Sequence, residues 1–426
     1  MAVRSFSFAI LTLSMNLRQH TTFIVFPLLV LLLCMPAEAS AASRTQASTK
    51  LEYSGWLPYW RVASSTKDVL PNVSKLSEVN PFGYTVKKDG SLNDAAQISR
   101  TEWQTLFVAA KKQNVRVIPT IMWSDTEAIH NVLSNKKLRK AHVAAIVKMV
   151  ESNGFDGVDI DYEGKRASDR DNYSAFLKEL SAALAKNKAN KWLMCTIEAR
   201  TPPQDLYKTI PTDLEYANDF KAINKYCDRV RLMTYDQQRA DLSLNAAAGK
   251  ELYAPVADVA WVRKVANLAL KDIDKSKLVL GVATYGYIYQ VMPYSDGSGY
   301  SYSLLEAFNP KYGTDTAREY GITPKRNSAG ELAFTYVPKS TPSTLPNNAA
   351  LSAKAPKGTH SSLMAALGSI ALAKEKGKQS PFYMLTWSDA TAIEAKVKLA
   401  KELGLRGVAI FKLDGGQDPL LWSVLK

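Results

Sequence analysis

Short apolar, strand-like runs recur along this sequence, and amphipathic helical stretches separate them. In the stretch 139–152, for example, Val143, Ile146 and Met149 recur at helical spacing, and Gly154 follows as a stop signal. The eight strand candidates are residues 54–60, 80–86, 116–123, 154–163, 192–199, 229–236, 277–286 and 405–413. Eight strands that alternate with helices predict an α/β fold, a closed (β/α)8 barrel. A doubly wound open sheet is the alternative that the same alternation allows.

The long interval between the seventh and eighth strand candidates divides the chain. Residues 51–287 hold barrel strands one to seven, and residues 381–426 hold strand eight and the terminal helices. The aromatic, turn-rich segment 288–380 predicts a small α+β insertion, and its low-complexity part, 338–359, predicts a flexible surface loop. With 426 residues, 46% of them hydrophobic and 22% charged, the composition is that of a globular protein with a sizeable core.

An apolar run near the N-terminus predicts an export signal. The run FIVFPLLVLLLCM at 23–35 follows Arg18, and small residues within 37–41 offer a cleavage site. The run is short for a membrane span. We therefore expect residues 1–39 to be a secretory signal peptide.

The expected mature protein is exported, either extracellular or in the cell envelope, and meets the membrane only if the signal stays uncleaved. Residues 40–50 are small and polar and predict a tether. The true start is either Met1 or Met15.

Two cysteines remain after such processing. Cys195 lies inside a strand candidate and Cys227 lies just before another. An oxidising compartment would allow them to pair. Their positions favour two buried free thiols, and the sequence leaves the bridge open.

The chain is basic, with 54 Lys and Arg against 40 Asp and Glu and a formal net charge of +14. A basic surface attracts nucleic acids, membranes and anionic wall polymers alike, so charge alone selects no partner. The absence of a recognition-helix, zinc or aromatic–basic motif argues against nucleic acid as the partner. We expect a monomer.

The segment Asp156-Gly-Val-Asp-Ile-Asp-Tyr-Glu163 is the richest in chemistry. Because alternate side chains of a strand share a face, Asp159, Asp161 and Glu163 point the same way. Like charges in one low-dielectric site resist joint ionisation, so Glu163, at the end of the strand, is placed to stay protonated as an acid. A solvated acidic edge strand and a site for a hard metal ion are the alternatives; we expect no metal.

These residues resemble a known family. Asp156–Glu163 matches DxxDxDxE, the signature of the family-18 glycoside hydrolases, the chitinases and their relatives. Further segments resemble the same family in the same order, namely Met233–Asp236 (M-x-Y-D), Gly281–Gly286 and Ala392–Asp414, and the insertion occupies the place of the family's small α+β domain. The resemblance covers about residues 52–426 and implies a TIM barrel.

The resemblance implies a retaining glycosidase that acts on β-linked N-acetylglucosamine-containing glycans, chitin or peptidoglycan, without a cofactor. The 2-acetamido group of the substrate would serve as the nucleophile. Glu163 would be the general acid and base, and Asp161 would hold the acetamido N–H. Asp159 would tune Asp161 through a shared proton, and Tyr235 would bind the acetamido carbonyl. The supporting residues would be Asp156, Asp236 and Met233.

Aromatic residues at other strand ends are suited to stacking on sugar faces. The candidates for substrate binding are Tyr59, Trp60, Phe82, Tyr84, Trp123, Tyr285 and Phe411. Phe411 stands where the family usually has a tryptophan, and Pro119–Trp123 replaces the S-x-G-G pattern, which resembles bacterial wall-associated branches. A non-hydrolytic, chitinase-like lectin is the alternative function, although such relatives usually lose the acid that is intact here as Glu163.

Overall fold

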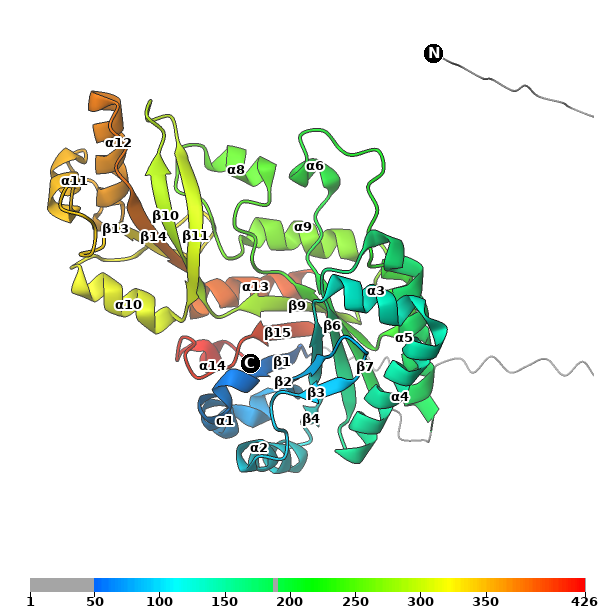
Figure 1. The fold of residues 1–426 in the computed structure, drawn as a ribbon. Helices are drawn as coiled ribbons and strands as arrows, with labels where there is room; N and C mark the ends of the chain where they lie inside the picture. The colour runs from blue at the N-terminus through cyan, green and yellow to red at the C-terminus, as the bar shows by residue number, and fades with distance from the viewer. Residues whose placement is uncertain (1–49, 187–190, 426) are drawn as a thin grey trace, which may run out of the picture. The chain divides into compact units, whose positions relative to one another are not determined.

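The computed structural model describes residues 50–186 and 191–425, so the expected signal peptide and nearly all of the tether lie outside it. Within these residues eight parallel strands form a closed barrel (Figure 1): β1 (Glu52–Pro58), β2 (Glu78–Val86), β5 (Thr120–Trp123), β6 (Gly157–Tyr162), β7 (Trp192–Glu198), β8 (Arg229–Met233), β9 (Leu278–Ala283) and β15 (Gly407–Phe411). The ring runs β1-β15-β9-β8-β7-β6-β5-β2 and closes because β2 pairs with β1. The predicted barrel is confirmed, and the open sheet is excluded.

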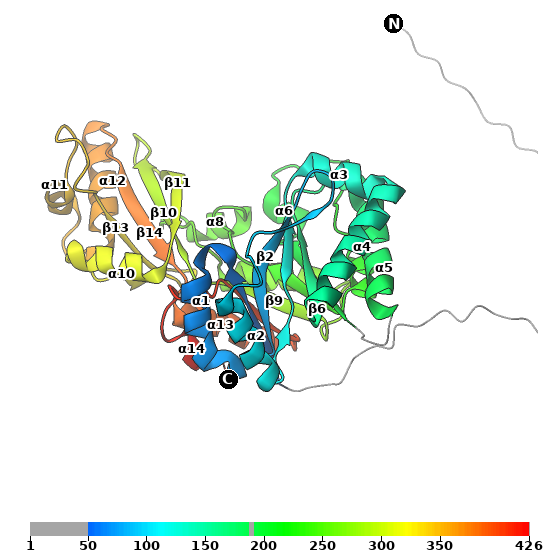
Figure 2. The ribbon, with the colours of Figure 1, turned by 60° about the horizontal axis from the view of Figure 1, so that its bottom comes forward.

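Two short strands and a set of helices complete the barrel. β4 (Arg116–Val117) pairs with β2 ahead of β5, and β3 (Leu92–Asp94) runs antiparallel to β2. The helices are α1 (Val62–Val69), α2 (Thr101–Lys112), α3 (Thr126–Ser134), α4 (Lys136–Ser152), α5 (Arg170–Ala185), α6 (Pro203–Leu206), α7 (Phe220–Tyr226), α8 (Leu242–Ala248), α9 (Val259–Ala269), α13 (Ala390–Glu402) and α14 (Leu421–Val424). Figure 2 shows α3, α4 and α5 side by side along the outside of the barrel. None of the helices in the described ranges is long and apolar enough to cross a membrane.

The insertion between β9 and β15 is built on an antiparallel sheet, which Figure 1 shows with its helices. Its strands are β10 (Gly286–Pro293), β11 (Tyr300–Phe308), β12 (Lys325–Arg326), β13 (Leu332–Tyr336) and β14 (Phe382–Trp387), and its helices are α10 (Pro310–Glu319), α11 (Asn348–Lys354) and α12 (Met364–Lys376). β14 pairs with β10 and β13 in this sheet. The insertion therefore extends beyond the expected boundary at residue 380, because the last strand returns to the sheet before the chain re-enters the barrel.

The segment 338–359, expected to be a flexible loop, contains α11. Leu351 of this helix is fully buried. The helix packs against α12 so closely that a Cβ atom at Gly368 would lie 1.9 Å from the Leu351 carbonyl oxygen. The expectation of a flexible loop is wrong over α11, because low local complexity carries no information about a tertiary contact of this kind.

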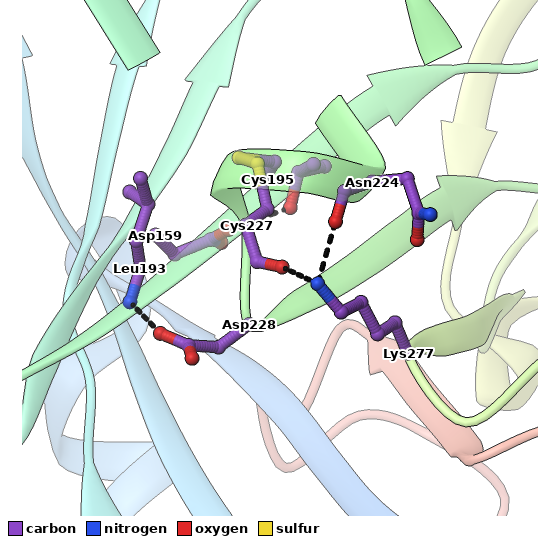
Figure 3. The surroundings of a disulfide bond; sticks show 8 residues. Asp159, Leu193, Cys195, Asn224, Cys227, Asp228 and Lys277 are labelled. Carbon is purple, nitrogen blue, oxygen red and sulfur yellow. Dashed lines mark hydrogen bonds between the residues drawn. A yellow bond between two sulfur atoms is a disulfide. The ribbon is translucent and has the colours of Figure 1, made fainter. Parts of the chain in front are cut away.

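A disulfide joins Cys195 of β7 to Cys227, which follows α7 (Figure 3). The two Cα atoms are 6.0 Å apart, within the range that a disulfide spans. Around the bridge, Lys277 donates hydrogen bonds to the carbonyl oxygens of Asn224 and Cys227. The preference for free thiols is therefore wrong. β7 and β8 are neighbours in the barrel, so the two buried cysteines meet.

Candidate active site

The carboxylate motif lies on β6, and two local features fix how that strand is placed. Asp156 accepts a hydrogen bond from the Val117 amide at 2.8 Å, which ties the start of β6 to β4. A Cβ atom at Gly157 would lie 2.2 Å from the Trp192 carbonyl oxygen, so the close pairing with β7 requires glycine there. From this start the side chains of Asp159, Asp161 and Glu163 follow one another along the barrel interior.

Asp159 is fully buried, and donors from three other strands surround it. Its Oδ2 accepts from Trp56 Nε1 at 3.1 Å and from Thr120 Oγ1 at 2.8 Å. Its Oδ1 accepts from Thr196 Oγ1 at 2.8 Å. No hydrogen bond joins Asp159 to Asp161 in the described part of the chain, so the expected shared proton has no counterpart in this geometry. Both oxygens of Asp159 already serve as acceptors for other groups.

Arg231 of β8 supplies the positive charge for this part of the barrel. Its Nη1 lies 2.8 Å from Asp159 Oδ2 in an ion pair without hydrogen-bond alignment, and its Nη2 donates to Glu78 of β2. Its guanidinium also lies over the Trp56 ring, 5.3 Å from the centroid. Burial lowers the pKa of Arg231, but the charges of Asp159 and Glu78 outweigh that effect and raise it. The guanidinium therefore stays charged.

Asp161, one step nearer the barrel mouth, has a different environment. Only 3% of the residue is exposed, and its buried Oδ1 has no hydrogen-bond partner among residues 50–186 and 191–425. Burial raises the pKa of Asp161 well above its usual range, and the negative charges of Glu163 and Asp159 raise it further. An unpartnered buried oxygen in a polar barrel is an open position for a donor from a ligand.

Glu163 follows β6 directly and is half-buried, with its amide donating to the Trp123 carbonyl at 2.8 Å. Burial raises the pKa of Glu163, and the charges of Glu198 and Asp236 act in the same direction, whereas Lys165 opposes them. The side chain can therefore keep its proton at higher pH than an exposed glutamate and then release it to a basic oxygen. This is the behaviour that a general acid requires.

Tyr235 and Asp236 follow β8, which only β7 separates from β6 and Glu163. Asp236 has a left-handed backbone with φ of 61°, and its Oδ1 accepts hydrogen bonds from the hydroxyls of Tyr285 and Tyr287. A non-glycine residue in that region is held there by its surroundings, which here are the two tyrosines. Met233, at the end of β8, packs against the buried cluster that contains Tyr285 and Tyr287. The side chain of Asp236 is thereby fixed at the barrel mouth.

Five of the seven aromatic candidates form a connected row of rings, which begins at Tyr59, whose ring centroid lies 4.9 Å from that of Trp60. Phe411 contacts Tyr235 (5.5 Å between centroids, nearly parallel), Tyr285 at 6.2 Å and Phe82 at 6.0 Å. Phe82 in turn contacts Trp60 at 5.9 Å, and Trp60 is 50% exposed. The row leads from the carboxylates to an exposed indole, which is the arrangement expected of a saccharide cleft.

The other two candidates lie elsewhere. Tyr84 and Trp123 are buried in the core between barrel and helices. The pairing of β2 with β5 shifts register between Phe82 and Tyr84. The extra residue turns the side chain of Tyr84 to the outer face of the barrel, away from the cleft. Trp123 alternates with Met122 on β5 and therefore also faces outward. The prediction that Tyr84 and Trp123 line the cleft is wrong.

Sequence reasoning missed four residues of the site: Arg231, Glu198, Lys165 and Tyr287. Glu198 ends β7 beside Glu163, and an acid at the C-terminal end of a barrel strand was a signal that could have been used. Arg231 lies in a strand that otherwise looks apolar, and its partners come from distant segments. No group of three or more His, Cys, Asp or Glu side chains within the described ranges is arranged to hold a metal ion.

Comparisons with known proteins agree with this geometry. Residues 55–416 match the family described as glycosyl hydrolases family 18. The uncharacterized glycosylase YvbX of Bacillus subtilis (strain 168) is 25% identical over 302 residues, 71% of this chain and 70% of that protein.

Two solved structures share the fold. The spore cortex-lytic enzyme SleL of Bacillus megaterium QM B1551 matches with a TM-score of 0.63 at 22% identity, over 89% of this chain and 74% of SleL. A class V chitinase from Pseudomonas fluorescens Pf-5 matches with a TM-score of 0.62 at 20% identity, over 88% of this chain and 98% of the chitinase. With the family match spanning most of its length, the chain belongs to glycosyl hydrolase family 18.

Proposed function

We propose that the protein is an exported, retaining glycosidase that cleaves β-linked N-acetylglucosamine-containing glycans by substrate-assisted catalysis. The observation that carries the proposal is the pair of carboxyls at the end of β6. Asp161 has a buried, unpartnered oxygen, and Glu163, two residues later, is half-buried, and burial raises its pKa. One group is open to a donor from the substrate, and the other holds a proton for the leaving oxygen.

The reaction has two steps. In the first, the carbonyl oxygen of the 2-acetamido group attacks C1 while the bond from C1 to the leaving oxygen breaks, and Glu163 transfers its proton to that oxygen. This gives an oxazolinium ion and a free chain end. In the second step, water attacks C1 and loses a proton to Glu163, so the acetamido group is restored and the configuration at C1 is retained.

The other residues orient the acetamido group and compensate its charge. Asp161 accepts its N–H, and in its ionised form the carboxylate compensates the positive charge of the oxazolinium ion. The Tyr235 hydroxyl donates to the acetamido carbonyl, and Asp236, fixed by Tyr285 and Tyr287, contacts sugar hydroxyls. Phe411 packs under the sugar at the cleaved bond.

The test is reducing-end release from chitin oligosaccharides and purified peptidoglycan by the residue 40–426 protein and its Glu163→Gln variant. We expect the variant to lose at least about a thousandfold in kcat while its affinity for glycan changes little. Glu179→Gln, which alters an α5 carboxylate paired with Arg139, is the matched control and should keep full activity. Cleavage of de-N-acetylated oligosaccharides at the normal rate would contradict substrate assistance. Glycan binding without any cleavage by the wild type would favour the lectin.

A hollow next to the aromatic row favours a glycan that carries carboxylates, such as peptidoglycan, over chitin. It has a volume of about 290 Å³, and its wall includes Trp60, Arg61, Tyr285 and Lys412. Lys412 pairs with Asp414, whereas the exposed Arg61 guanidinium has no partner within residues 50–186 and 191–425. A free guanidinium beside an exposed indole suits a sugar with an acidic substituent, because arginine binds carboxylates through two parallel hydrogen bonds.

This preference is tested by comparing Arg61→Gln with wild type on peptidoglycan strands with and without stem peptides, and on chitin oligosaccharides. We expect kcat/KM to fall about tenfold on peptidoglycan strands, which carry carboxylates, and to stay unchanged on chitin oligosaccharides. Lys67→Gln, which removes an exposed cation from α1, is the control. Equal losses on both substrates would contradict a carboxylate site at Arg61.

Export is supported by the disulfide between Cys195 and Cys227, because such bonds persist in oxidising compartments. Cell fractionation followed by N-terminal sequencing tests it. A mature terminus near residue 40 in the extracellular or envelope fraction is the expected result. An intact N-terminus on soluble protein inside the cell would contradict export.

A further inference from the structure

A carboxylate from the neighbouring strand holds the turn that follows Glu163. Glu198 ends β7, and its Oε1 accepts a hydrogen bond from the Gly164 amide at 3.1 Å. Its Oε2 accepts from Asn218 Nδ2 at 2.7 Å and lies 3.4 Å from Lys165 Nζ. Gly164 has a φ of 65°, so the chain reverses immediately after Glu163 in a conformation that glycine permits. The carboxylate of Glu198 thus fastens this turn to β7.

The strand register explains why Glu198 is at this position. β6 and β7 are parallel, with Asp161 opposite Thr196. Continued by two residues, this register brings Glu163 opposite Glu198, and both side chains belong to the face that points into the barrel. The two carboxyls therefore meet at the mouth of the barrel.

Lys165 completes the arrangement. Its side chain is buried, donates to the Tyr162 carbonyl oxygen and lies over the Tyr173 ring, 4.8 Å from the centroid. The charged groups that act on Glu163 are therefore Glu198 on β7, Asp236 after β8 and Lys165 in its own turn. Asp161 lies on the same face of β6, and the charge of Glu163 raises its pKa. Three carboxyls face one ammonium group.

We propose that Glu198 is a positioning residue for the acid/base Glu163: it fixes the Gly164–Lys165 turn and, through its negative charge, keeps the proton on Glu163. The inference rests on the proposed role of Glu163. Glu198 does not touch the reacting atoms; it acts through Glu163, and Lys165 opposes its charge.

The directions of the pKa shifts agree with this geometry. Burial raises the pKa of Glu163, and the charge of Glu198 is the next contribution in the same direction. Burial alone would raise the pKa of Glu198 too, but Lys165 and the hydrogen bonds from Asn218 and Gly164 bring it below its usual value. Glu198 is therefore ionised at the pH at which Glu163 still holds its proton. When the environment moves the pKa values of two neighbouring carboxyls apart in this way, the group with the higher pKa, here Glu163, is assigned as the acid.

The test is the pH profile of kcat/KM for Glu198→Gln, Glu198→Asp and Lys165→Met on a chitin oligosaccharide or peptidoglycan strand that the wild type cleaves. The alkaline limb reports loss of the proton from the general acid. We expect Glu198→Gln to move this limb to lower pH by at least about 0.5 unit, because a like charge is removed. Glu198→Asp, which keeps the charge, should restore it. Lys165→Met should move the limb to higher pH.

Glu179→Gln, an amide substitution outside the site, should leave the limb in place. A Glu198→Gln variant that loses activity equally at every pH, with the alkaline limb unmoved, would overturn the inference and leave Glu198 a structural residue only. If Glu163→Gln itself keeps its activity, the proposed function fails, and that outcome is independent of the Glu198 profiles. Circular dichroism at each pH shows whether the Lys165→Met variant is folded. If it is not, the pH profiles of Glu198→Gln and Glu198→Asp alone test the inference.

Discussion

Arg231 and Asp159 form an ion pair inside the barrel, with Nη1 2.8 Å from Oδ2 and both side chains fully buried. The pair joins β8 to β6, and the second arm of Arg231 reaches Glu78 on β2. One guanidinium therefore links three strands that lie far apart in the sequence. It also places a positive charge beside Asp159, whereas Asp161 and Glu163, nearer the barrel mouth, have pKa values that burial raises.

Removing this cation should destabilise the fold strongly. Arg231→Met leaves Asp159 buried without a counterion and leaves Glu78 with Arg116 alone, 3.5 Å away. Breaking a buried pair in this way costs about 3–5 kcal/mol. Urea unfolding, followed by tryptophan fluorescence, measures the loss. The control is Arg263→Met, which removes an exposed pair with Glu402 and should cost less than about 1 kcal/mol. Equal losses in the two variants would mean that the buried pair contributes no more than a surface one.

Replacing Asp161 by asparagine should stabilise the protein at neutral pH while abolishing activity. The pKa of Asp161 is raised in the folded state, so its contribution to stability is present below the unfolded pKa and is lost as pH rises through the folded pKa. The amide side chain of the Asp161→Asn variant does not ionise and has no such loss. The gain at pH 7 should be about 1.4 kcal/mol for each unit by which the folded pKa exceeds the unfolded one.

Unfolding at pH 4 and pH 7 checks this expectation. The difference between the Asp161→Asn variant and wild type should be small at pH 4 and should grow toward pH 7. Asp213→Asn, at an exposed loop position, is the control and should show no such growth. A variant less stable than wild type at pH 7 would contradict the interpretation of Asp161 as a destabilising buried carboxyl.

Glu52 at the other end of the barrel should show the opposite pH dependence. Burial raises its pKa, but hydrogen bonds from Arg229 and Arg406 dominate and bring it from 4.5 to about 2. Its stabilising effect is present above the unfolded pKa and is lost as pH falls from about 4.5 to 2. Glu52→Gln should therefore cost about 3 kcal/mol at pH 7, at about 1.4 kcal/mol per unit, and almost nothing at pH 2. Acid titration of the unfolding free energy beside Glu306→Gln, an exposed site on β11, tests this.

The elements that sequence reasoning predicted are those encoded locally. The eight strands and the alternation of Asp159, Asp161 and Glu163 follow from periodicity, which each segment carries by itself. The same periodicity failed at Tyr84, because a register shift beside Gly83 turns the strand and only the pairing with β5 reveals it. The prediction also assumed that aromatic residues at strand ends face the mouth of the barrel, whereas Trp123 faces the helices.

Several of the missed features depend on contacts between distant segments. Arg231 meets Glu78 and Asp159 only because β8, β2 and β6 enclose one interior, and no local pattern specifies that meeting. Glu198 reaches Gly164 through the register of β7 on β6. The sequence did not predict α11 for the same reason. Leu351 is buried against α12, where Gly368 has no side chain and allows the close contact. Closure of the barrel, and with it the electrostatics of the site, is a property of the whole chain.

Reduction of the disulfide should destabilise the protein, and the same experiment bears on the proposed export. Cys195 and Cys227 are 32 residues apart, and closing a loop of that length in the unfolded chain stabilises the fold by about 3–4 kcal/mol. Dithiothreitol should lower the unfolding midpoint of the wild type, and the Cys195→Ser/Cys227→Ser variant should match the reduced protein and not respond to the reagent. The closed segment carries Glu198 and Asn218, so reduction should also lower activity at temperatures where the fold is still intact. A wild type indifferent to dithiothreitol, with two thiols that react once it is denatured, would show that the pair is not formed, and would remove the support that the bridge lends to export.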